Sequence, residues 1–155
     1  MKETTIYKAL FALSLLIITG LIYKFFIKGD DVKKIKDGRY EIKMSTENRE
    51  FVMAEMRLFL ESIKTINEGI AENNPEKIAS IGKQSGVCKV EAVPKGLIKS
   101  LPLEFKNMGM QTHDYFDKIA TIAKENYSQK GIQKELNSLM NNCVACHRTY
   151  KISGK

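Results

Sequence analysis

Cysteine, histidine and proline are scarce in this chain, and tryptophan is absent. The 155 residues include three cysteines, two histidines and three prolines. No segment alternates apolar and polar side chains over a long stretch, so no β-sheet is expected. The net charge is +7, yet no dense run of Lys and Arg stands out, which argues against nucleic acid as a partner. An apolar content of 43% and a charged content of 28% instead predict one folded domain.

The longest apolar run lies at the N-terminus. Residues 9–23 carry no charge, and apolar residues continue to position 27 past a single Lys24. A membrane span needs about 20 residues, so residues 1–28 are predicted to form an uncleaved, single-pass membrane anchor. A cleaved signal peptide is the alternative, but bulky residues stand where a cleavage site needs small ones. The polar residues 29–45 are expected to form a linker.

Four helices are predicted in the remaining residues 46–155. The first begins at a cap at Thr46 and has one apolar stripe at helical spacing: Val52, Met56, Phe59, Ile63, Ile66 and Ile70. The second starts at Asn74 and Pro75, the third at Pro102, and the fourth runs from a cap at Ser128 to about residue 152. Short loops between amphipathic helices predict an all-α fold, an antiparallel up-down-up-down four-helix bundle preceded by a transmembrane helix.

A chemical motif ends the fourth predicted helix. Cys143, Cys146 and His147 form the pattern C-x-x-C-H, the attachment signature of c-type haem. Two thiols three residues apart suit the two vinyl groups of a porphyrin. His147 lies four residues after Cys143, so on a helix its imidazole projects from the same face and can ligate iron. The sequence therefore predicts one covalently bound haem c.

Two other uses of the motif are weaker. A thioredoxin-like thiol pair belongs near a βαβ pattern, and no such pattern is present. A zinc site needs two more ligands, and Cys88 and His113 would have to come from separate helices.

A helical bundle with C-x-x-C-H on its fourth helix resembles the cytochrome c-prime family. The resemblance covers roughly residues 45–152. It includes Lys151, four residues after the haem histidine, and Arg49, four residues before Met53. An electron carrier with respiratory redox proteins as partners is expected if the iron has six ligands, and a peroxidase-type enzyme is disfavoured because no distal His-Arg arrangement is present. The resemblance also implies a haem domain in the periplasm, so the predicted anchor would lie in the bacterial cytoplasmic membrane, which departs from the usual soluble member of this family. Cys88 is either buried or a link within a homodimer, a common assembly in this family.

The sixth position on the iron separates two functions. The resemblance places Met53 over the haem, and helix rise puts Met53 nearly level with His147 if the fourth helix ends at residue 152. A thioether there favours electron transfer. Met56, one turn further on, is the weaker candidate, and ligation by His113 is disfavoured. An open position would instead make a five-coordinate protein that binds NO or CO. Arg49 and Lys151 are candidates to pair with haem propionates or to flank His147, and ordinary solvated surface charge is the alternative.

Overall fold

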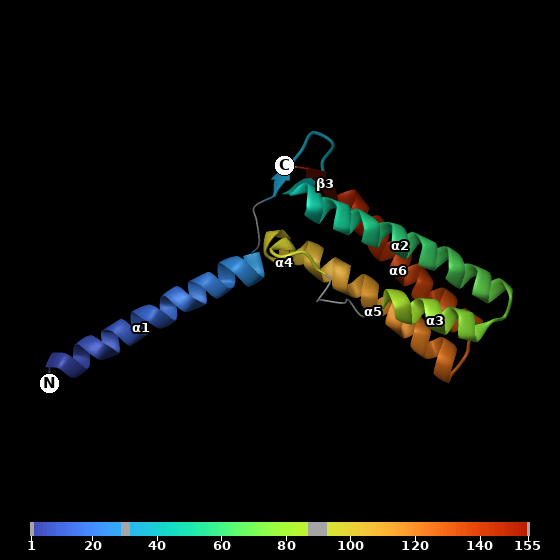
Figure 1. Ribbon diagram of the computed structural model, residues 1–155, viewed down its shortest axis with the longest axis horizontal. Helices are drawn as coiled ribbons and strands as arrows, with labels where there is room; N and C mark the ends of the chain where they lie inside the picture. The colour runs from blue at the N-terminus through green and yellow to red at the C-terminus, as the bar shows by residue number, and fades with distance from the viewer. Residues whose placement is uncertain (1, 29–31, 87–92, 155) are drawn as a thin grey trace.

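The computed structural model describes residues 2–28, 32–86 and 93–154 (Figure 1). Helices dominate these residues, and three short strands accompany them. In chain order the elements are α1 (Lys2–Ile22), the π-helix η1 (Tyr23–Lys28), β1 (Lys33–Lys34), β2 (Tyr40–Met44), α2 (Thr46–Ala71), α3 (Pro75–Ser85), α4 (Leu97–Ser100), α5 (Leu103–Glu125), α6 (Gln129–Thr149) and β3 (Tyr150–Gly154).

Polar caps start three of the four long helices in the body of the molecule. The Asn74 side chain accepts a hydrogen bond from the backbone of α3, and Pro75 follows at its first position. The Ser128 hydroxyl accepts one from the backbone of α6. These starts are confirmed. The predicted cap at Thr46 is off by one residue, because Ser45 accepts the hydrogen bond from Asn48. Caps of this kind satisfy amide groups that have no partner within the helix.

The main core lies where these four helices meet. Helix α5 packs against both α3 and α6, and α2 packs against α3. The side chains buried there are Ile66, Ile78, Phe116, Ile119, Ala123, Ile132, Leu136 and Leu139. Gly82 lets α3 approach α5 closely, since an added Cβ would stand 3.0 Å from the Phe116 carbonyl oxygen.

A three-stranded sheet closes one end of the helices (Figure 1). Strand β2 is central, pairing antiparallel with β1 and parallel with β3, so Tyr40 lies opposite Tyr150. Ile42 and Met44 of β2 are buried in a second cluster with Leu97, Leu101 and Phe105. The predicted all-α four-helix bundle is therefore wrong, and residues 29–45, expected to be a linker, contain two strands. This segment forms a strand and not a loose linker because Ile42 and Met44 bury their side chains against residues of the helices.

Helix α1 extends away from the body (Figure 1), and its large apolar side chains are exposed. The predicted transmembrane helix is a further correction. Within the described part of the chain, no helix combines the length and apolar character needed to cross a membrane. The uncharged residues 9–23 lie between Lys8 and Lys24, and this run is shorter than the about 20 residues that a span requires. The predicted location in the cytoplasmic membrane, with a periplasmic haem domain, is contradicted by the same finding.

Candidate functional site

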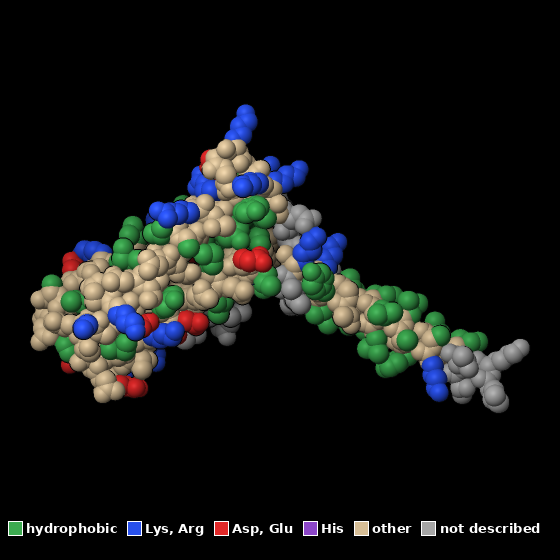
Figure 2. Space-filling model, turned by 180° about the vertical axis from the view of Figure 1, so that it is seen from behind, with side chains coloured by type: hydrophobic (Ala, Val, Ile, Leu, Met, Phe, Trp, Pro, Cys, Tyr) green, Lys and Arg blue, Asp and Glu red, His purple; other side chains and the backbone are tan. Residues whose placement is uncertain are grey.

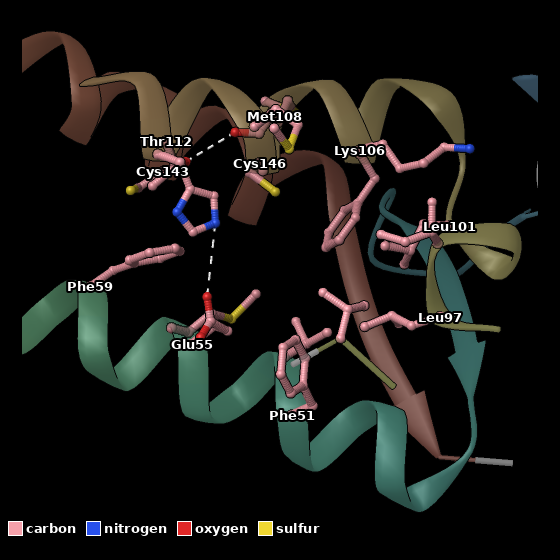
Figure 3. Close-up of a pocket in the computed structure, with 18 of the residues that line it drawn as sticks. Phe51, Glu55, Phe59, Leu97, Leu101, Lys106, Met108, Thr112, Cys143 and Cys146 are labelled. Atoms are coloured by element: carbon pink, nitrogen blue, oxygen red, sulfur yellow. Dashed lines mark hydrogen bonds and ion pairs between the residues drawn. The ribbon is translucent and has the colours of Figure 1, made fainter. Parts of the chain in front are cut away.

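An apolar cavity of about 250 Å³ opens between α2, α5 and α6. Figure 3 shows Phe51, Glu55 and Phe59 of α2 facing Cys143 and Cys146 of α6 across it, with Leu97 and Leu101 near one end. Glu55, Lys106, Thr112, His113 and His147 are the polar or charged side chains in its wall. Its wall shares Leu97, Leu101 and Phe105 with the second core cluster, so α4 helps to form the cavity.

Helix α6 brings the two motif cysteines to the wall of this cavity. Both thiols are half-buried and free of disulfide bonds. Burial raises the pKa of the Cys143 thiol, and burial together with the nearby Cys143 raises the pKa of Cys146 to about 11. Redox-active thiols have lowered pKa values, so this environment argues against a thioredoxin-like pair. His147 follows on the next position, is exposed, and also lines the cavity.

A second pocket, of about 200 Å³, adjoins the first beside the sheet. The two pockets share part of their walls, namely Met56, Phe105, Cys146 and His147. The smaller one is also lined by Met53, Arg49 and Lys151, so it brings these three predicted site residues together with Cys146 and His147. Its remaining lining residues are Arg39, Tyr150 and Ile152.

The position of Met53 needs a different argument from the one that the sequence offered. Helix α6 ends at Thr149, three residues before the expected end, because Tyr150 begins β3. The prediction that Met53 lies level with His147 depended on a helix end at residue 152, so the length of α6 no longer supports it. Met53 and His147 nevertheless lie in the wall of one pocket, and both Met53 and Met56 are half-buried. Met56 differs in lining both pockets.

His113 is already engaged by protein groups. Its Nδ1 lies 2.8 Å from the Ser85 carbonyl oxygen, and its Nε2 lies 3.8 Å from a Glu55 carboxylate oxygen. The Phe59 ring packs edge-on against the imidazole, with 5.0 Å between centroids. Cys88, the third cysteine, falls outside the described residues.

The general expectation of a metal-binding protein needs correction. Among the described residues, no group of three or more His, Cys, Asp and Glu side chains could hold a metal ion. Cys143, Cys146 and His147 are three such residues and lie close together in the sequence, but in the structure they do not form a group that could hold a metal ion. Protein side chains in this part of the chain therefore provide no closed site for a bare ion such as zinc.

Sequence reasoning missed three residues of the smaller pocket. Arg39 was overlooked because its segment was taken for a linker, and Tyr150 and Ile152 because α6 was expected to continue. A signal was present, since residues 40–44, Tyr-Glu-Ile-Lys-Met, alternate between apolar and polar side chains.

Comparisons of the chain with protein-family models, curated proteins and solved structures give no match.

Proposed function

We propose that this chain is a mono-haem c-type cytochrome that carries electrons, with the haem bound covalently by Cys143 and Cys146 and ligated by His147. One observation carries the proposal. Two free thiols and an exposed imidazole, in the spacing of the haem attachment signature, line one apolar cavity. Burial raises the pKa of both thiols, which disfavours disulfide exchange between them.

The chemistry of the two pockets fits a haem. Ligand pockets usually enclose about 300–1,000 Å³, so neither pocket alone would hold a porphyrin. Together they offer what an amphipathic porphyrin needs, with an apolar chamber for the ring beside a cationic chamber for its carboxylates. Met56 lies in the wall that the two pockets share. Its flexible thioether side chain could change rotamer and so join the two pockets when a ligand binds.

Each residue would have a defined task. The thiols of Cys143 and Cys146 would each add across one vinyl double bond, with the sulfur bonding to one carbon and the thiol proton going to the other carbon. Attachment therefore needs no oxidant. His147 would donate a nitrogen lone pair to the iron, and Met53 would supply the sixth ligand. The haem would contribute a one-electron Fe(III)/Fe(II) couple, whose potential a thioether ligand raises. Apolar side chains such as Phe51 and Leu97 would exclude water from the ring.

Covalent attachment provides the first test. The full chain, co-expressed with a cytochrome c maturation system, should keep its haem through extraction with acidified acetone. The Cys143→Ala/Cys146→Ala double variant should lose haem under the same conditions. Cys88→Ser is the matched control, because it removes a cysteine outside the motif and should retain haem. Loss of haem from the unaltered chain would show that the protein is not a c-type cytochrome.

The sixth ligand provides the second test. Met53→Ala should convert the oxidised protein from a low-spin to a high-spin spectrum and let CO bind the reduced iron. Met56→Ala is the matched comparison, since it removes the other half-buried thioether of the same pocket. An unchanged spectrum for Met53→Ala together with a high-spin spectrum for Met56→Ala would assign ligation to Met56.

Binding of NO or CO by a five-coordinate haem is the second candidate function. The larger cavity favours it, because its wall is mostly apolar and Met53 is not part of that wall. A high-spin spectrum of the unaltered protein that shifts on adding NO or CO would select this function over electron transfer.

A further inference from the structure

The smaller pocket gathers positive charge without a carboxylate in its wall. Arg39, Arg49 and Lys151 line it, and none of its other lining residues is acidic. Within the described part of the chain, neither Arg49 nor Lys151 forms a salt bridge. Arg39 is compensated by Asp37 outside the wall, so an anionic ligand in the pocket would relieve chiefly the repulsion between Arg49 and Lys151.

Arg39 reaches the pocket because of the sheet. Its residue lies between β1 and β2, and the pairing of Tyr40 with Tyr150 holds it beside the segment that follows α6. Asp37 fixes the guanidinium in place, since its carboxylate accepts hydrogen bonds of 3.0 and 2.6 Å from Nε and Nη2. The pKa of the Asp37 carboxyl is lowered by these hydrogen bonds from Arg39, with a smaller contribution from the charge of Lys151. The hairpin therefore presents an oriented cation beside Lys151.

We propose that Arg39, held by Asp37 on the β1–β2 hairpin, joins Arg49 and Lys151 in binding the haem carboxylates and thereby raises the haem potential. The inference rests on the proposed function. The wall that the two pockets share supports the inference, because Cys146 and His147 line both the smaller pocket and the apolar cavity where the ring would lie. Figure 2 shows Lys and Arg side chains gathered where the hairpin projects from the body.

The physical consequence concerns redox equilibrium. A fixed positive charge near the haem disfavours Fe(III), which carries one more positive charge than Fe(II). Asp37 occupies Nε and one hydrogen of Nη2, so three of the five guanidinium N–H donors of Arg39 remain for a haem carboxylate. Removing Arg39 should therefore lower the reduction potential.

The test compares three variants of the haem-loaded full chain by spectroelectrochemistry. Arg39→Gln should raise the ratio of oxidised to reduced protein at a fixed potential by several-fold to about tenfold, and a tenfold change equals about 59 mV for one electron. Arg39→Lys keeps the charge and should stay within about twofold of the unaltered chain. Lys43→Gln is the matched control, because it removes one positive charge from β2 at a side chain outside both pockets.

Three outcomes would overturn the inference, and they separate it from the proposed function. Equal shifts for Arg39→Gln and Lys43→Gln, in protein that keeps haem through acid extraction, would refute the role of Arg39 alone. A Lys substitution that shifts the potential as far as the Gln substitution would refute the role of charge. Unaltered chain that holds no covalent haem would refute both proposals. Circular dichroism checks that each variant folds, and if Arg39→Gln does not fold, Arg39→Met replaces it, because it also removes the charge and keeps an apolar stem of similar length.

Discussion

The Ile42→Ala variant tests whether residues 40–44 belong to the folded body. Ile42 is 2% exposed and packs in the second core cluster. The substitution removes three carbon atoms, and at about 0.8 kcal/mol for each buried carbon it should cost about 2.4 kcal/mol before any cavity forms. The cavity that remains after partial collapse adds to this cost, so the free energy of unfolding should fall by about 2.5–4 kcal/mol. A loose linker would show no such loss.

Urea unfolding followed by circular dichroism measures this change. Lys43→Ala is the matched control on the same strand, because the Lys43 side chain is 62% exposed. Its effect should stay within about 0.5 kcal/mol of the unaltered chain. If Ile42→Ala changed the free energy of unfolding no more than Lys43→Ala does, the packing of β2 against the helices would be refuted.

Three further measurements examine other contacts. Ser62→Ala should cost about 1–2 kcal/mol in chemical unfolding, since it leaves the buried Ser85 hydroxyl without its 2.6 Å partner, and the double Ala variant should cost less than two single losses. Gly82→Val should lower the melting temperature, because backbone atoms of α5 block the new side chain at 3.0 Å. In haem-free chain, alkylation of Cys146 by iodoacetamide should reach its midpoint near pH 11. Because the unfolded thiol ionises at lower pH, the contribution of Cys146 to stability should fall as the pH rises from 9.0 to about 11. A midpoint near 9.0 would contradict its burial.

The helices could be predicted from the sequence because their signals are local. Asn74 with Pro75, and Ser128 with the apolar positions after it, mark helix starts through hydrogen bonds to the next turn. The apolar spacing within α2 also placed Met53 and Met56 on their helix. Such signals lie within a few residues of the structure that they specify.

The sheet was missed because its strands are short and its pairing is distant in the sequence. The alternation in residues 40–44 covers only five positions, and β3 begins where the helical pattern of α6 was expected to continue. The parallel pairing joins residues 40–44 to residues 150–154, so no local pattern announces it. Because α6 ends at Thr149, its length no longer predicts that Met53 lies level with His147.

The same distant pairing explains why the motif alone gives only part of the candidate site. The spacing of Cys143, Cys146 and His147 predicts a covalent attachment point on one helix face. It says nothing about what surrounds the far edge of a ligand held there. That surrounding is formed where β2 lies beside β3, which brings Arg39 next to the residues that follow α6. The local motif therefore predicts the ligand class, and the nonlocal sheet sets the charge that such a ligand would meet.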